Sequence, residues 1–342
     1  QLMKNFITII QKFKYLLKGK EAKVLLENFI SLSSLQLVGM VLPLITLPYI
    51  LRVLGFENYG IIVFSSTLIA YFTSLTDFSF KLTATRDVAI SKHSKIKLSY
   101  IYSKVMIIKG LFLSLSFLII TLIVFNYKPF YENRIIYFLT APILLGHALF
   151  PDWFFQGIEK MKYITFLNIG VKLFFTLCVF VFIQKESDYW IYPLLQSLGF
   201  LIAGLVGQFI LIYKYKLKFV WIKYQVLFQT IKFNIPIFIN QFIPNLYNNT
   251  SVFLLGILTN NSMVGIYNAI QIVVNLCISL IEILSRVFFP HLNRRYGSFS
   301  KYEKLMIFVS IILICISLMS HKIVFWYLNI DQNNAFLILT VL

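Results

Sequence analysis

The chain alternates between long apolar runs and short basic segments along its whole length. Each apolar run is long enough to cross a bilayer, which takes about 20 residues in a helix. Because unpaired backbone groups are too costly in lipid for open strands, the runs are predicted to be helices and the protein an all-α integral membrane protein. The expected spans are residues 28–51, 58–80, 104–125, 134–151, 163–183, 190–213, 233–258, 264–289 and 305–325, with a tenth beginning near Asn334.

Composition and charge placement support this class. Of the residues, 59% are apolar and 13% are charged, against roughly a quarter charged in an ordinary soluble domain. The net charge of +18 could suggest nucleic acid, but the lysines and arginines gather in alternate loops. That distribution follows the positive-inside rule and puts the N-terminus in the cytoplasm. We therefore expect membrane and no nucleic-acid partner.

The first 25 residues alternate lysines with apolar residues and fit a basic amphipathic segment on the inner leaflet. The cysteines Cys178, Cys277 and Cys315 fall within predicted spans, without disulfide or zinc spacing. The sequence offers neither a metal cluster nor a phosphate-binding Gly-rich loop, so no metal and no cofactor is expected.

A weak internal repeat appears when the sequence is shifted by 205 residues. The shift places Asp77 on Glu282 and Lys81 on Arg286, and it also pairs Gly60 with Gly265. Six spans per unit preserve orientation, so the pattern predicts two parallel six-helix repeats of a transporter, the second one truncated. The expected organisation is an N-terminal segment at 1–25, a lobe of helices 1–6 at 26–220, and an incomplete lobe with helices 7–9 and the start of 10 at 221–342.

Polar side chains follow one helical face in several spans. In the eighth span they recur at steps of three, four or seven residues from Asn268 to Arg286, which keeps them on one face. Polar groups in hydrocarbon turn toward protein or water, so these faces either line a water-filled cavity or join helices by hydrogen bonds. The candidate cavity residues are Asp77, Asn168, Lys172, Gln241, Asn245, Gln271, Asn275, Glu282 and Arg286.

Lys172 lies near the middle of its span, where its ammonium cannot easily reach the membrane surface. We expect it to face the cavity; the alternative is an ion pair with Asp77 or Glu282. Lys109 is closer to the end of its span and is expected to extend to the interface.

Asp77 and Lys81 are four residues apart with the acid first, the favourable order for a pair on one helix, and Glu282 and Arg286 copy it. We expect the two pairs to gate the cytoplasmic mouth of the cavity. The acids could carry a coupled proton or Na⁺, or could simply hold the bases. The candidate gate and loop residues are Lys81, Arg86, Asp152 and Glu159.

"HALFPD" places His147 five residues before Asp152, the spacing that some membrane acyltransferases use for a base and its carboxylate. Residues five apart on a helix do not face each other well, and no nucleophile follows. Catalysis is therefore not expected.

Several motifs resemble the polysaccharide flippases, the Wzx-type branch of the superfamily that also contains multidrug antiporters and lipid II flippases. The most specific is "PDWFFQGIEKMKYITF" at 151–166, which resembles the cytoplasmic connection between helices 4 and 5 of that family. "DFSFKLTATRDVAI", "VGIYNAI" and "FFPHLNR" are also similar to family patterns, although Ser79 stands where the family often has Gly. The Trp153, Phe154 and Phe155 cluster fits an aromatic belt at the interface.

The resemblance implies a multidrug-antiporter-like bundle that is not an enzyme. It implies transport of an undecaprenyl-pyrophosphate-linked oligosaccharide, such as an O-antigen repeat unit, across the bacterial inner membrane by alternating access, alongside a polysaccharide polymerase and chain-length machinery. Two alternatives remain open at this point. A multidrug antiporter of the same superfamily would line its cavity with acids and aromatics, and a membrane-embedded polymerase or acyltransferase would carry a sizeable polar lumenal loop.

Overall fold

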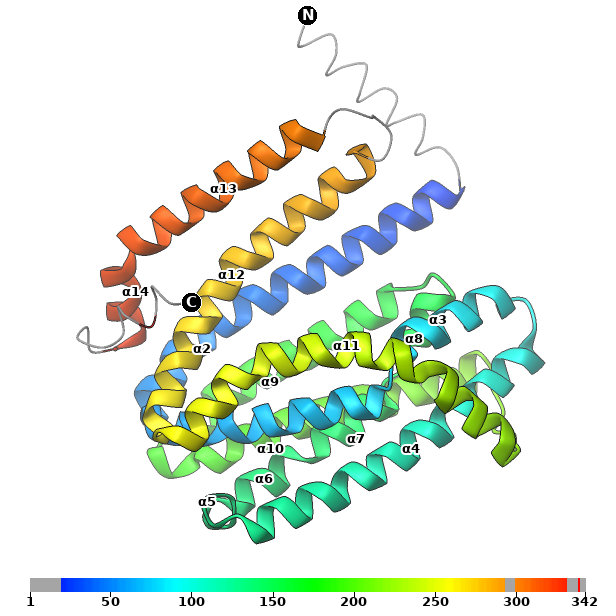
Figure 1. The fold of residues 1–342 in the computed structure, drawn as a ribbon, viewed down its shortest axis with the longest axis horizontal. Coiled ribbons are helices and arrows are strands. Elements are labelled where there is room, and N and C mark those ends of the chain that lie inside the picture. Colours follow the sequence, from blue (N-terminus) through cyan, green and yellow to red (C-terminus); the bar gives the residue numbers. More distant parts are fainter. Residues whose placement is uncertain (1–19, 293–298, 331–337, 339–342) are drawn as a thin grey trace, which may run out of the picture.

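The computed structural model describes residues 20–292, 299–330 and 338, and it is helical almost throughout these ranges (Figure 1). For residues 20–23, 25–26, 283–292, 299–301 and 305 only the backbone is described. The helices are α2 (Lys20–Asp77), α3 (Phe80–Ser91), α4 (Lys95–Asn126), α5 (Lys128–Glu132), α6 (Arg134–Thr140), α7 (Pro142–Leu149), α8 (Asp152–Gly157), α9 (Lys162–Phe182), η1 (Glu186–Trp190), α10 (Ile191–Phe209), η2 (Ile210–Lys214), α11 (Tyr224–Leu258), α12 (Asn261–Leu292), α13 (Phe299–Met319) and α14 (His321–Leu328).

The first two predicted spans are joined without a loop. They are the two arms of α2, which reverse direction at Gly55, where φ is 74° and ψ is 168° (Figure 1). A side chain is strained at such a positive φ, so glycine suits this position. We call this side of the bundle the Gly55 end, and the opposite side, where α3 and α8 lie, the α3–α8 end.

A second break separates α2 from α3. Phe78 and Ser79 have φ values of 40° and 62°, in the left-handed region that non-glycine residues rarely adopt. The helix therefore ends at Asp77 rather than continuing to residue 80, and α3 starts in a new direction. The prediction that Asp77 and Lys81 form a pair on one continuous helix is wrong for this reason.

Seven stretches of the described residues are long and apolar enough to cross a membrane. One of them, Glu27–Ser91, contains both arms of α2 and so accounts for the first two predicted spans. The helix α11 is not among the seven, because a series of asparagines and glutamines lowers its hydropathy. The tenth predicted span, near Asn334, lies outside the described residues. The all-α membrane class is thus confirmed.

The two arms of α2 diverge from the Gly55 end, and α12 runs beside the first of them (Figure 1). At the Gly55 end the start of α12 also meets the start of the second arm, and glycine allows this close approach: a Cβ added at Gly60 would lie 1.7 Å from the carbonyl oxygen of Asn261. Likewise, a Cβ added at Gly265 would lie 2.4 Å from the carbonyl oxygen of Phe56. Small residues commonly permit such backbone contact between membrane helices.

Two hydrophobic cores hold the bundle. The larger one contains buried residues from both arms of α2 together with residues of α4, α6, α7, α9, α11 and α12. The second one lies at the α3–α8 end and includes Phe80, Trp153, Phe154 and Phe155. The second core fixes the α3–α4 hairpin against α8, which positions the charged groups described below.

Replacing Gly60 with alanine tests the backbone contact between α2 and α12. We expect a loss of about 1–3 kcal/mol in the free energy of unfolding, because the new methyl group meets a backbone oxygen that cannot rotate away. The measurement is the midpoint of thermal unfolding of the purified protein in detergent. Gly110→Ala is the matched control, since a Cβ there meets no atom within 4 Å. Equal midpoints for the two variants would contradict the contact.

Candidate functional site

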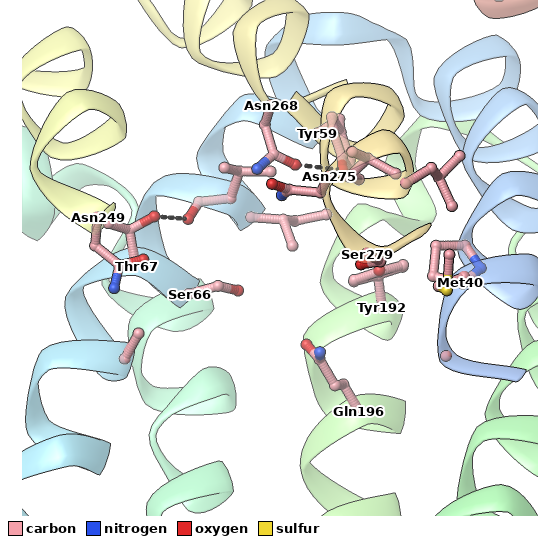
Figure 2. Close-up of a pocket in the computed structure, with 17 residues that line it drawn as sticks. Met40, Tyr59, Ser66, Thr67, Tyr192, Gln196, Asn249, Asn268, Asn275 and Ser279 are labelled. Atoms are coloured by element: carbon pink, nitrogen blue, oxygen red, sulfur yellow. Dashed lines mark hydrogen bonds between the residues drawn. The ribbon is translucent and has the colours of Figure 1, made fainter. Parts of the chain in front are cut away.

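A polar cavity of about 520 Å³ lies between both arms of α2, the start of α10, α11 and α12 (Figure 2). It begins close to the Gly55 end, because Tyr59 in the second arm of α2 forms part of its wall. Figure 2 shows Tyr59 of α2 grouped with Asn268 and Asn275 of α12, while Ser66, further along α2, and Gln196 of α10 lie elsewhere on the wall. The cavity therefore depends on the crossing of α2 and α12.

The polar groups that line this cavity are neutral. None of its 17 lining residues is acidic or basic. They offer both donors and acceptors of hydrogen bonds, because amides and hydroxyls carry both. The polar lining residues are Tyr59, Ser66, Thr67, Tyr192, Gln196, Asn249, Asn268, Asn275 and Ser279.

Two of these groups show how the wall is built. The Tyr59 hydroxyl donates to Oδ1 of Asn268 at 2.8 Å, which ties α2 to α12. Oε1 of Gln196 is buried and has no hydrogen-bond partner in the described part of the chain. A buried acceptor of this kind costs about 1–3 kcal/mol if nothing pairs with it. Gln196 is thus ready to accept a hydrogen bond from a molecule in the cavity.

Lys172 of α9 lies at the edge of the cavity. A Cβ added at Gly39, which lines the cavity, would be 2.7 Å from the Lys172 Nζ. The ammonium group therefore occupies the space that a side chain at position 39 would fill. Among the described residues no carboxylate lies within 4.0 Å of it. Asp77, one of the two expected alternative partners, instead pairs with Lys109.

Most of the other predicted cavity residues lie on the expected helices but outside the cavity lining. Asn275 lines the cavity, whereas Gln271, one turn earlier in α12, does not. On α11, Gln241 and Asn245 bond along their own helix, from Nδ2 of Asn245 to the carbonyl of Gln241 at 3.1 Å.

Asn168, Glu282 and Arg286 complete the predicted set. Asn168 donates to the carbonyl of Ile164 in its own helix at 2.8 Å. Glu282 is exposed on α12. The side chain of Arg286 lies outside the described residues. Three lining amides, Gln196, Asn249 and Asn268, were not among the predicted site residues, although Asn268 belongs to the polar face of the eighth span.

A buried ion pair joins Asp77 to Lys109. The Lys109 Nζ lies 2.8 Å from Oδ1 of Asp77, and the lysine side chain is only 2% exposed. The expectation that Lys109 extends to the interface is therefore wrong. Its side chain is covered by the second core and finds its charge partner inside the bundle.

Lys81 and Asp152 form a looser pair near this one, with Nζ and Oδ2 4.0 Å apart. Asp152 accepts a hydrogen bond from the backbone N–H of Trp153 at 2.8 Å, at the start of α8. His147 lies against the ring of Phe200, with ring centroids 4.4 Å apart. Among the described residues no hydrogen bond or ion pair joins His147 to Asp152, although both lie near Asp77, Lys81 and Lys109.

The aromatic cluster of α8 is a core element. Trp153, Phe154 and Phe155 are 1%, 0% and 0% exposed. The expected belt at the membrane interface is therefore wrong. The Thr85 hydroxyl donates to the carbonyl of Trp153 at 3.1 Å, and α3 approaches Gly157 so closely that a Cβ there would lie 2.8 Å from the Thr85 carbonyl oxygen.

The turn between α8 and α9 is held by a residue that the sequence reasoning missed. Asn28, in the first arm of α2, donates to the carbonyl of Glu159 at 3.1 Å and accepts from the N–H of Met161 at 3.2 Å. Glu159 has a φ of 59°, so its backbone conformation needs this support. Its carboxylate lies 3.8 Å from the Lys92 Nζ.

Comparison with known proteins places the chain in a family. The family model described as "Polysaccharide biosynthesis protein" matches residues 25–296. This chain belongs to that family. The match confirms the resemblance that the motif at 151–166 and its companions carry. No solved structure matches this polysaccharide biosynthesis chain.

Two curated relatives carry the description "Putative O-antigen transporter". The one from Escherichia coli (strain K12) is 28% identical over 267 residues, which cover 78% of this chain and 64% of the relative. The one from Shigella dysenteriae is 23% identical over 294 residues, which cover 85% of this chain and 74% of the relative. The chain thus matches a little under two thirds of the length of the first relative.

The Asp77–Lys109 pair can be tested by removing one partner and then both. Asp77→Asn leaves the buried Lys109 ammonium without its counter-charge, and we expect a loss of about 1–3 kcal/mol in the free energy of unfolding, less than for a fully buried pair because the Asp77 side chain is 37% exposed. The double variant Asp77→Asn with Lys109→Met removes both charges and should regain most of this loss. Thermal unfolding midpoints in detergent measure both. The single variant Lys109→Met completes the comparison. If the loss of unfolding free energy in the double variant equals the sum of the losses in the two single variants, Asp77 and Lys109 do not interact.

Proposed function

We propose that the protein to which this chain belongs is a flippase that moves an undecaprenyl-pyrophosphate-linked oligosaccharide across the bacterial inner membrane by alternating access. The observation that carries this proposal is the neutral cavity of amides and hydroxyls with one lysine, Lys172, at its edge. The names of the two relatives support it. The substrate is a repeat unit of O-antigen or of a related surface polysaccharide.

The chemistry of such a substrate fits the cavity. A sugar presents many hydroxyls, and each exchanges a hydrogen bond with water for one with an amide or hydroxyl of the wall. The pyrophosphate needs a cation, and a charge-assisted hydrogen bond from Lys172 supplies one. The polyprenyl tail stays in the bilayer, since it gains nothing from a polar cavity.

The alternatives from the sequence fit less well. A cavity for cationic drugs is expected to hold both acids and aromatics, and this lining contains two tyrosines, Tyr59 and Tyr192, but no acid. An acyltransferase needs a base that its carboxylate orients, and His147 lies against Phe200 instead. Transport without catalysis is therefore the reading that the described residues support best.

The proposed architecture is a pair of parallel repeats in an antiporter-like bundle, and reciprocal contacts support it. Gly60 approaches Asn261, and Gly265 approaches Phe56. Under the shift of 205 residues, position 261 is the counterpart of Phe56 and Gly265 is the counterpart of Gly60. The two contacts therefore join the same pair of equivalent positions, with the two repeats exchanged. Contacts that exchange in this way are those of two units related by a twofold axis.

The orientation and the coupling complete the proposal. Lysines and arginines concentrate in the loops of the α3–α8 end, which puts that end and the N-terminus in the cytoplasm. Asp77 and Glu282 are the acids that would carry a coupled proton or Na⁺. A polysaccharide polymerase and its chain-length machinery would act on the product after transport.

Replacing Lys172 tests the function. We expect Lys172→Ala to abolish complementation of a flippase-deficient strain by the full-length protein, because the pyrophosphate loses its cation in the cavity. Lys172→Arg keeps the charge and should retain part of the activity. The readout is surface polysaccharide, together with the amount of protein in the membrane.

The matched control is Gly170→Ala, two residues earlier in α9, where a Cβ meets no atom within 4 Å. It should transport like the wild type. Full activity of Lys172→Ala at normal membrane abundance would overturn the role of Lys172.

A further inference from the structure

A second cavity, of about 210 Å³, lies at the α3–α8 end between α3, α4 and α11. It shares no lining residue with the polar cavity. The lining of the polar cavity is neutral, whereas the lining of this second cavity also contains acidic and basic side chains. The polar lining residues used below are Arg86, Asp87, Lys104 and Asn234.

The charges in this second cavity do not balance. Asp87 is the one carboxylate in the lining, and it lies between two cations. Its Oδ1 is 3.6 Å from Nη2 of Arg86, and its Oδ2 is 3.5 Å from the Lys104 Nζ. Both distances exceed those of a good charge-assisted hydrogen bond. Two cations thus share one acid at a distance, which leaves a net positive charge in the lining; the Lys104 side chain is 16% exposed and that of Arg86 is 62% exposed.

Asn234 of α11 supplies an independent sign of a ligand. The residue is only 3% exposed, and it lines the second cavity. Its Oδ1 is buried without a hydrogen-bond partner among the described residues. Such a buried carbonyl costs about 1–3 kcal/mol unless a donor reaches it. The second cavity therefore offers cations on one side and an unpaired acceptor on the other.

We propose that this second cavity binds a phosphate ester that carries a neighbouring hydroxyl or amine. The phosphate lies between Arg86 and Lys104, and the hydroxyl or amine donates to Asn234. A volume of 210 Å³ is about seven times the share of one water molecule in the liquid, roughly 30 Å³. It therefore suits a phosphate with a short polar group and is too small for an oligosaccharide.

The position of the second cavity gives the ligand a structural effect. Arg86 belongs to α3, Lys104 to α4 and Asn234 to α11, so one bound molecule joins the α3–α4 hairpin to α11. Binding to this arrangement stabilises it by mass action. The inference does not require the transport function, because it depends only on the groups that line this second cavity.

The ligand could come from the membrane, as a phospholipid head group, or from solution, as a small phosphate ester. The experiment separates these sources with full-length protein in nanodiscs of phosphatidylcholine, whose head group has no N–H donor. Radiolabelled glycerol 3-phosphate is the soluble probe, measured by equilibrium dialysis. Phosphatidylethanolamine, added to the nanodisc lipid, is the membrane probe, and native mass spectrometry measures the lipid retained by the released protein.

The variants change the charge in opposite directions. We expect Lys104→Gln to weaken binding about tenfold, the usual effect of losing a hydrogen bond to a charged group. Asn234→Leu keeps a side chain of similar size but removes the acceptor for the hydroxyl or amine, so it should also weaken binding. Asp87→Asn removes the competing acid and should tighten binding. The matched control is Lys97→Gln, on the same helix as Lys104 but outside the lining of the second cavity, and it should change nothing.

The outcomes decide the proposal. Binding of either probe with this order of variants supports it, and the probe that binds identifies the source. The proposal is wrong if glycerol 3-phosphate does not bind and phosphatidylethanolamine is retained no more than phosphatidylcholine. It is also wrong if Asp87→Asn weakens binding. Should Lys104→Gln fail to reach the membrane, Asp87→Asn and Asn234→Leu still decide it, because tighter binding in the first variant and weaker binding in the second cannot both arise from general loss of stability.

Discussion

The backbone contact between α2 and α12 at Gly60 and Gly265 is the constraint on which the polar cavity depends. It brings the two helices together at the Gly55 end, where the Tyr59 hydroxyl can reach Asn268. Beyond this point the arms of α2 separate, and the space between them and α12 becomes the cavity. A larger side chain at either glycine would move α12 away and change the width of the cavity together with the register of its amides.

The absence of water in the bilayer explains why two lysines with similar sequence surroundings differ. A buried ammonium is costly in lipid unless a carboxylate or water compensates it. Lys109 is enclosed by the second core and has Asp77 at 2.8 Å. Lys172 has no such partner among the described residues and reaches toward the cavity edge at Gly39. The first lysine is thus neutralised by the fold, and the second keeps its charge available.

The periodicity of the sequence predicts where a helix lies and which of its faces is polar, but it does not predict which helices pack against one another. The apolar runs located the spans, and the polar face of the eighth span correctly included Asn275 and Asn268. Neither Phe78 nor Ser79 by its own residue type indicates the left-handed backbone that breaks the helix. The one signal was the resemblance, because Ser79 stands where the family often has Gly. Asp77 therefore turned from Lys81 to Lys109, a partner 32 residues away. The same limit hid the burial of Trp153, since an aromatic cluster next to lysines suits both a core and an interface.

The distribution of charge bears on how a substrate can leave as well as enter. In the transport proposed above, sugars would exchange hydrogen bonds with water for similar ones in the neutral cavity, so they would be held without a large change in free energy. A pyrophosphate among several buried cations would be bound too tightly to release, whereas conduction through a site requires binding that is also weak enough to leave. One lysine at the edge meets that requirement. Several of the described basic groups, such as Lys81, Arg86 and Lys92 of α3, lie at the α3–α8 end, where they would attract the anionic head group of the proposed substrate before it loses its water.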